Sequence, residues 1–338
     1  MVVPPPPVVA YYPSMATLNF NSLSHYALKP KLRLRKRHIT QNITHLSKRM
    51  DIICGQETKL NPNEDKALAS SLPGWGIFYS NHPDGGQAGV ITTVSPALKS
   101  KFTITQLPTP AAWNGHLLVL SFDDKTGIHK SFSVINVYFP QEGIRQAKLI
   151  ADINDMVLAE CVHVLGDFNF VEKAEDSASP ETYSLSGKVE VGWTNLKTKL
   201  GLYEVAQETH TFMRRVKDRI VTARLDRIYT NLQMVDCALS APYAFLPDIP
   251  FSILPSLIEH AAPNLTTQRR ARGCSDHVPV AIQFRSSLDN GHGSANVPRW
   301  LVESMEFKTA SLEPWLPQIS AKAASGLWRF IKWSSMTL

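Results

Sequence analysis

The sequence predicts an α/β fold in which two mostly antiparallel sheets pack face to face, with helices on their outer faces. Three observations support this prediction. Short apolar runs of strand length recur along most of the chain. Turn sequences join several of these runs directly, as in antiparallel hairpins. Helical patterns lie between other runs, which places helices outside the sheets.

The first half of the chain consists mainly of predicted strands. In order, the elements are a strand at residues 16–20, a helix at 35–50, and strands at 52–54, 75–79, 89–94, 117–122 and 131–138. The turn sequence PDGG at residues 83–86 and the sequence DDKTG at residues 123–127 each separate two of these strands. Asp123 and Asp124 therefore belong to a hairpin turn, an interpretation that we favour over a metal site.

The second half alternates helices with strands. It contains a helix at residues 144–158, a strand at 162–165 that stops at Gly166-Asp167, a polar, serine-rich loop at 172–187, a helix at 191–202, and strands at 224–229 and 279–284. We therefore expect three parts: a disordered proline-rich leader at residues 1–15, one folded domain at 16–286, and a tail at 287–338 with amphipathic helical segments.

Composition indicates a soluble, folded, intracellular protein. The 338 residues are 43% hydrophobic and 19% charged, which excludes a disordered chain. The prolines at residues 4–7 prevent the helical apolar stretch of a signal peptide, and no apolar run is long enough to span a membrane. Cys54 and Cys161 lie in apolar runs without metal-finger spacing, which fits a reducing compartment, either nucleus or cytoplasm.

The formal net charge of +6 suits a polyanionic partner such as nucleic acid, although a merely basic protein has the same charge. Basic residues gather at residues 29–37, 214–219 and 269–272. The first run matches a nuclear import signal, but we favour the interpretation that it is a solvated stretch, because short basic runs are common.

Polar or acidic residues follow several predicted strands, where ordinary turn residues are expected. They are Asn19, Glu57, Tyr138, Asp167, Asn169, Asp226, Asp276 and His277. Each alone is typical of a cap or a turn. Their joint occurrence, each in or beside a strand, instead indicates one site.

These residue types supply the chemistry of phosphodiester cleavage. Glu57 and Asp276, with Asn19 beside them, offer the hard oxygen ligands that Mg²⁺ prefers. Asp167 suits the orientation and deprotonation of a water molecule. His277, Asn169, Asn19 and Tyr138 offer donors to a phosphate that gains negative charge. Asp226 is the candidate that fixes the tautomer of the histidine.

The motifs TLNFNSL, QET, NVYFP, GDFN, RLDRIY and SDHVPV occur in the order typical of the endonuclease/exonuclease/phosphatase family, over residues 17–284. This resemblance implies a four-layer α/β/β/α sandwich and a Mg²⁺ cofactor, with Mn²⁺ as a substitute. It implies that Glu57 binds the metal with Asp276 near it, and that Asp167 positions the nucleophile with Asn169. It further implies that His277, paired with Asp226, contacts the scissile phosphate, as do Tyr138 and Asn19.

Within that family the chain most resembles the apurinic/apyrimidinic-type endonuclease domain of non-LTR (LINE-type) retrotransposons. The segments that carry this likeness are TLN, the HTF…RLDRIY stretch of residues 210–229, and SDHVPV followed by VPRW. The resemblance implies DNA as the partner and nicking that leaves a 3′-hydroxyl, without a membrane or an obligate protein partner. The chain departs from the pattern at Gln141, where Asn or Asp is common, in the loop at residues 172–187, and in lacking a polymerase motif.

Two alternatives remain open at this stage. A phosphatase or sphingomyelinase of the same family shares the metal centre, so the core motifs do not separate it from a nuclease. A catalytically dead, folded retroelement remnant is the second alternative, although every expected site residue is present. Trp75, Trp113 and Trp193 are candidates for stacking on bases, but we favour buried core positions for all three.

Overall fold

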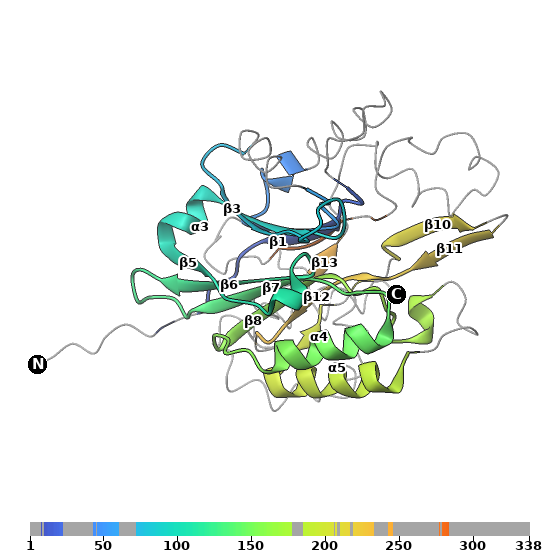
Figure 1. Cartoon of the computed structure of the whole chain (residues 1–338). Helices are drawn as coiled ribbons and strands as arrows, with labels where there is room; N and C mark the ends of the chain where they lie inside the picture. The colour runs from blue at the N-terminus through green and yellow to red at the C-terminus, as the bar shows by residue number, and fades with distance from the viewer. Residues whose placement is uncertain are drawn as a thin grey trace, which may run out of the picture. The chain divides into compact units, whose positions relative to one another are not determined.

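A computed structural model places two six-stranded sheets at the centre of the protein (Figure 1). The model describes residues 8, 10–22, 43–44, 46–60, 72–177, 185–205, 207, 210–216, 219–232, 243–245, 277 and 279–283. Two units divide the chain, Met1–Gly291 and His292–Leu338, and every described residue belongs to the first. The predicted tail and most of the predicted helix at 35–50 therefore lie outside the described residues.

The first sheet joins the two ends of the folded domain. Its strand order is β13 (Tyr243–Phe245), β14 (Val280–Gln283), β1 (Met15–Asn19), β2 (Ile52–Gln56), β4 (Val90–Val94) and β3 (Gly76–Ser80). Only the pair β1–β2 is parallel, and the other pairs are antiparallel. Strand β1 begins at Met15, one residue before the predicted strand.

The second sheet has the same mixed character. Its strand order is β5 (Phe102–Gln106), β6 (Leu117–Asp124), β7 (Phe132–Tyr138), β8 (Cys161–Asp167), β12 (Asp226–Thr230) and β9 (Tyr203–Glu204). Here β7 and β8 are the parallel pair. The remaining described elements are the helices α3 (Pro96–Lys101), α4 (Gly143–Asn154) and α5 (Gly187–Leu200), the 3-10 helices η1 (Ala111–Trp113) and η2 (Ala174–Asp176), and the ribbon of β10 (Phe212–Val216) and β11 (Arg219–Ala223).

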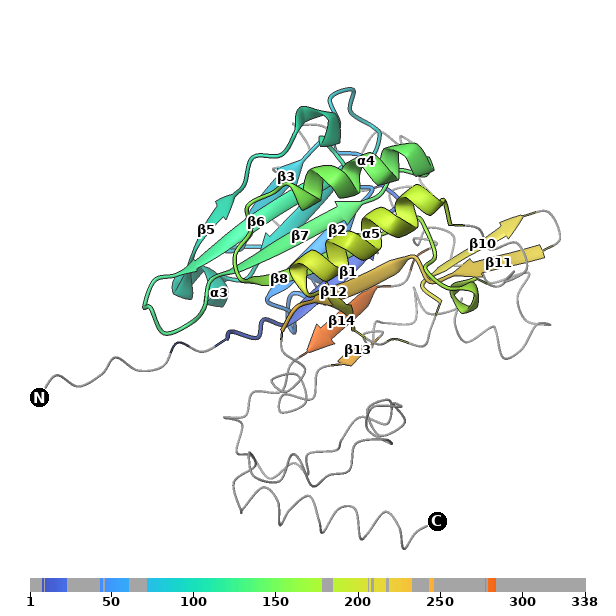
Figure 2. The same ribbon diagram turned by 90° about the horizontal axis from the view of Figure 1, so that it is seen from below.

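Alternation along the strands sorts the apolar side chains into three clusters. Residues of both sheets, including Met15 and Leu120, form the cluster between them. On the outer face of the second sheet, α4 and α5 lie side by side (Figure 2) and contribute Leu149 and Trp193 to another cluster. Ala16 and neighbours pack on the outer face of the first sheet. The predicted sandwich of two mostly antiparallel sheets is confirmed.

Some element boundaries differ from the predicted ones. Helix α4 stops at Asn154 rather than at residue 158, while α5 begins at Gly187, before residue 191. Strand β8 continues through Asp167, and β12 begins only at Asp226. The predicted tryptophan positions are confirmed for Trp113 and Trp193, which are buried. Among the described helices, none combines the length and apolar character needed to cross a membrane.

Glycine at position 166 allows the two central strands of the second sheet to approach each other. A Cβ atom on Gly166 would lie 1.8 Å from the carbonyl oxygen of Val137 on β7. Any larger residue must therefore push β8 away from β7. Because Asp167 is the next residue, the close approach of β8 to β7 at this glycine also sets the position of the Asp167 carboxylate relative to β7.

Buried hydrogen bonds connect the two sheets next to the strand ends. Gln56 Nε2 of β2 donates to Asn136 Oδ1 of β7 at 2.7 Å, and also to Thr17 Oγ1 of β1 at 3.0 Å. Asn136 Nδ2 donates to the carbonyl oxygen of Ile91 on β4 at 2.7 Å. Buried polar groups cost free energy unless they are paired, so these bonds specify one alignment of the sheets.

Candidate active site

The polar residues predicted from the strand ends meet at one edge of the sandwich. Asn19 ends β1, Tyr138 ends β7 and Asp167 ends β8, while Glu57 follows β2. Asp226 begins β12 and pairs with Asp167 across antiparallel strands. A pocket of about 540 Å³ opens there, lined by Asn19, Asn21, Glu57, Lys59, Gln141, Asp167, Asn169, Phe212, Arg214, Leu225 and His277.

Asp167 is a buried carboxylate held by two asparagines. Its Oδ2 accepts a hydrogen bond from Asn19 Nδ2 at 2.8 Å, and its Oδ1 accepts one from the backbone N–H of Asn169 at 2.9 Å. Burial raises the pKa of Asp167 to about 6, and the charge of Asp226 adds to this, although His277 and the two hydrogen bonds oppose it. A carboxylate with a pKa near neutrality suits a general base.

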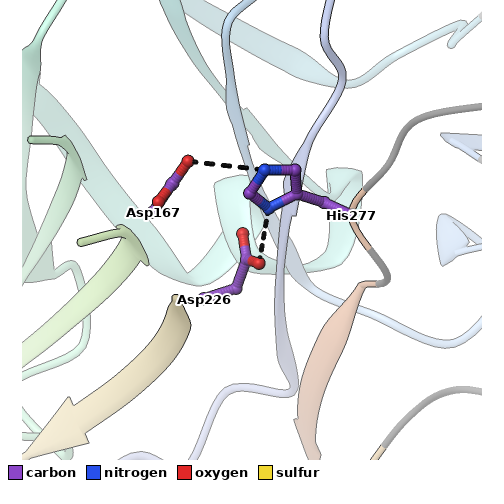
Figure 3. A group of neighbouring side chains, drawn as sticks. All are labelled: Asp167, Asp226 and His277. Atoms are coloured by element: carbon purple, nitrogen blue, oxygen red, sulfur yellow. Dashed lines mark hydrogen bonds and ion pairs between the residues drawn. The ribbon is translucent and has the colours of Figure 1, made fainter. Parts of the chain in front are cut away.

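His277 lies between the two aspartates (Figure 3). Its Nδ1 is 2.7 Å from Asp226 Oδ2, and its Nε2 is 3.8 Å from Asp167 Oδ2. The bond to Asp226 fixes the ring orientation and places a proton on Nδ1. Phe212 of the β10–β11 ribbon packs against the imidazole, with ring centroids 5.0 Å apart. His277 therefore presents Nε2 to the pocket.

Glu57 is the most accessible of the acidic residues in this group. The Tyr138 hydroxyl donates to Glu57 Oε1, and Lys59 Nζ lies 3.0 Å from Glu57 Oε2. Burial and the nearby Glu57 carboxylate raise the pKa of Tyr138, so the phenol stays protonated and keeps donating. His116 stacks on the Tyr138 ring and its Nδ1 bonds the Tyr138 carbonyl oxygen at 2.8 Å.

Unusual backbone conformations concentrate at the same pocket. The described non-glycine residues with positive φ are Asn21, Ser22, Glu57, Lys59, Ala88 and Asn169. Four of them line the pocket, and the other two bond to its wall: Ser22 N–H donates to the Glu57 carbonyl, and Lys59 N–H donates to the Ala88 carbonyl, each at 2.8 Å. Strained conformations persist where the surroundings enforce them, most often at functional sites.

Comparison with known proteins agrees with this geometry. The model of the Endonuclease/Exonuclease/phosphatase family matches residues 16–277. The chain belongs to the endonuclease/exonuclease/phosphatase family. Members of this family are phosphoesterases that generally depend on a divalent metal, so this chain is a phosphoesterase of that superfamily by descent. No curated protein matches the sequence.

Solved structures share the fold at low sequence identity. The AP endonuclease LMAP from Leishmania major matches with a TM-score of 0.57 at 15% identity, over 82% of this chain and 93% of that one. The 3′ phosphatase NExo from Neisseria, bound to a product DNA hairpin, matches at 0.54 and 19%, over 81% and 100%. The endonuclease domain of TRAS1, a telomere-specific non-LTR retrotransposon, matches at 0.48 and 11%, over 81% and 99%.

The residues at this family site fit a hard divalent cation. Glu57, Asp167, Asn19 and Asn169 all line the pocket, and their side chains carry the carboxylate and amide oxygens that Mg²⁺ or Mn²⁺ prefers. Ligand atoms of Asp167, Asp226 and His277 also lie within 4.8 Å of one another. That second group contains a nitrogen, and its Asp226 is already bonded to His277. The assignment of Glu57 as the metal ligand stays a prediction.

The structure brings together all the predicted site residues that it describes. These are Asn19, Glu57, Tyr138, Asp167, Asn169, Asp226 and His277; Asp276 lies outside the described residues. Their individual roles remain predictions. Lys59 and Asn21 were not predicted, although each lies two residues after a predicted one and could have been found by including those short loops.

Proposed function

We propose that the protein is a divalent-metal-dependent DNA endonuclease that nicks one strand, of the type found in non-LTR retrotransposons. The observation that carries this proposal is the arrangement of Asp167 and the His277–Asp226 pair across one pocket. Asp167 Oδ2 and His277 Nε2 are 3.8 Å apart. A base, Asp167, and a hydrogen-bond donor, His277, could therefore act on the same phosphate group. Glu57 lies in the wall of the same pocket.

In the proposed reaction, Asp167 accepts a proton from the water that attacks the phosphorus. The bond between the phosphorus and the 3′ oxygen breaks as the new bond forms, and the leaving oxygen takes a proton from solvent to become the 3′-hydroxyl. Asn19 and Asn169 hold its two oxygens in place. His277 donates from Nε2 to a phosphate oxygen, and Asp226 stabilises the charged imidazole. Glu57, oriented by Tyr138 and Lys59, would hold the divalent cation with Asn19, and the bound cation would supply Lewis-acid stabilisation of the phosphate charge.

DNA is the proposed substrate because two basic side chains, Lys59 and Arg214, line the pocket. Arg214 of the β10–β11 ribbon is exposed and lines the pocket with Lys59. The ribbon extends away from the sheets beside the site (Figures 1 and 2). A guanidinium matches the geometry of a phosphate diester, and the net charge of +6 supports a polyanion. The solved structures that share the fold include an AP endonuclease and a 3′ phosphatase bound to a product DNA hairpin.

The test is nicking of supercoiled plasmid by the full chain, with Mg²⁺ or with EDTA. We expect open circles to accumulate only with Mg²⁺ and only with an intact Asp167, with Asp84→Asn as the matched control because Asp84 is exposed. Release of phosphate from a 3′-phosphorylated oligonucleotide, without nicking, would instead indicate a phosphatase. A folded protein that does neither would be a catalytically dead remnant.

A further inference from the structure

Strand β12 carries opposite charges on its two faces. Asp226 points to the site, where it bonds His277, whereas Arg227 is fully buried and points to the opposite face with Tyr229. Arg224, just before the strand, is also buried. Two buried guanidinium groups therefore bracket the aspartate that orients the histidine.

A single aspartate from another loop holds both arginines. Asp176 Oδ1 accepts from Arg224 Nε at 2.8 Å and from Arg224 Nη2 at 2.6 Å. Asp176 Oδ2 accepts from Arg227 Nη2 at 2.7 Å. The backbone N–H of Arg224 donates to the Asp176 carbonyl at 2.8 Å, so main chain and side chain are tied together.

Further carboxylates balance the charge of the arginines. Glu204 pairs with Arg224, and Glu172 lies 3.4 Å from Arg227 Nη1 while it pairs with Lys197 at 2.6 Å. The group thus contains equal numbers of acidic and basic side chains. A buried network of this kind adds little net stability over apolar packing, yet it becomes costly when one partner is lost. Its value lies in fixing geometry.

The network reaches the site through the backbone. Asp176 belongs to the loop that follows Asp167, and Asp226 is the cross-strand partner of Asp167. The N–H of Phe168 donates to the Leu225 carbonyl at 2.9 Å, and the N–H of Asp226 donates to Thr211 Oγ1 at 2.9 Å. Fixing residues 224–227 therefore fixes the distance between Asp226 and the histidine.

We propose that Asp176, Arg224 and Arg227 are positioning residues that set the alignment of Asp226 and His277 for phosphodiester cleavage. The proposal rests on the proposed function for its kinetic consequence. None of the three lines the pocket, so they act on the rate through Asp226 and not on binding. A small displacement of a reacting group lowers the rate by up to ~100-fold.

The variant that tests this is Arg224→Met in the full chain. In this variant Arg227 still pairs with Asp176 at 2.7 Å and lies 3.8 Å from Glu204, so both carboxylates keep a cationic partner and we expect the protein to fold. Loss of Asp176 would instead take the shared partner from two buried guanidinium groups. We expect kcat for plasmid nicking to fall about 10- to 100-fold with KM for DNA unchanged. Arg224→Lys keeps the charge and should recover part of kcat.

The matched control is Leu196→Ala, which opens a cavity in the core under α5 and lowers stability while leaving every member of the ion-pair network in place. All variants are assayed at a temperature where circular dichroism shows them folded. Equal kcat values for Arg224→Met and Leu196→Ala would overturn the proposal.

A second measurement separates this proposal from the proposed function. We expect the Nδ1 proton of His277, bonded to Asp226 at 2.7 Å, to give a far-downfield proton NMR signal in the wild type. We expect that signal to broaden or shift in Arg224→Met and to persist in Leu196→Ala. If the wild type does not cleave DNA, the NMR signal by itself tests the positioning role. An unchanged signal in Arg224→Met then rejects that role.

Discussion

Two aspartates, Asp167 at the end of β8 and Asp176 at the end of η2, illustrate opposite uses of a buried carboxylate. Asp167 and Asp176 are each only 1% exposed. Burial would raise the pKa of both. For Asp176, Arg227 and Arg224 reverse that effect and lower its pKa, whereas Asp167 keeps a raised pKa of about 6. The carboxylate of Asp167, the proposed base, therefore lacks the paired arginines that Asp176 has. Asp176 is fully paired, which suits a structural role.

The largest expected effect is the loss of nicking activity on substitution of Asp167. Asp167→Asn removes the proposed base while keeping its size, so nicking should fall by roughly 10³-fold or more. The fold should persist, because the neutral amide is easier to bury than the carboxylate. Plasmid nicking and circular dichroism check both points, with Asp84→Asn as control. Substantial residual nicking would remove Asp167 from the base role.

Substitution of the structural carboxylate, Asp176, should lower the free energy of unfolding. Asp176→Asn leaves the guanidinium groups of Arg224 and Arg227 without their shared partner, which should lower the free energy of unfolding by about 3 kcal/mol. Urea unfolding measures it, with Asp167→Asn in parallel. Equal stability of the two variants would contradict the distinction drawn between these carboxylates.

The raised pKa of Asp167 also predicts a pH dependence of stability in EDTA. Between about pH 4 and pH 6 the folded protein holds a proton on Asp167 that the unfolded chain has released. Stability from this group is therefore full below pH 4 and is lost as the pH rises, by roughly 2–3 kcal/mol. The difference between wild type and Asp167→Asn isolates the contribution. A pH-independent difference would place the pKa elsewhere.

Substitution of Glu57, the proposed metal ligand, should raise the Mg²⁺ concentration that nicking requires. Glu57→Gln removes the charge of the proposed ligand but keeps the Tyr138 contact possible, so half-maximal nicking should need about 10- to 100-fold more Mg²⁺. Titration of Mg²⁺ with Glu142→Gln as the exposed control measures this. An unchanged titration would remove Glu57 from the metal shell.

The smallest expected effect lies at the margin of the ion-pair network. Lys197 pairs with Glu172 at a partly exposed position. Lys197→Met should therefore cost less than about 1 kcal/mol of unfolding free energy, and less at high salt. Urea unfolding at two salt concentrations measures it. A loss as large as that for Asp176→Asn would mean that the network does not weaken toward solvent.

The sequence predicted the fold class, and it predicted polar residues that the structure brings together, because both depend on local patterns. Strand-length apolar runs end in polar residues such as Asn19 and Asp167, and strand ends converge at a sheet edge. The ion-pair network was not predicted, because an arginine in RLDRIY looks like any surface arginine until its partners are known. Arg227 did carry a signal, since it lies between residues of a buried strand.

Other elements escaped prediction for physical reasons as well. The β10–β11 ribbon is rich in arginine and lacks the apolar alternation of a buried strand. The end of α4 at Asn154 depends on its C-cap, because the apolar residues Met156 and Leu158 continue the helical spacing beyond it. Glu172, in a segment predicted as a polar loop, accepts from Trp193 and Tyr229.

The pairing of β1 with β14 has a consequence for how the protein is made. Met15 lies opposite Ile282, and His277 lies three residues before the start of β14. The ribosome must therefore synthesise nearly the whole domain before this site can form. Asn19 and Asp167 are synthesised well before His277. A nascent or prematurely terminated chain would therefore carry Asn19 and Asp167 without His277, and the proposed nuclease activity would begin only after residue 277 and β14 have been synthesised and folded.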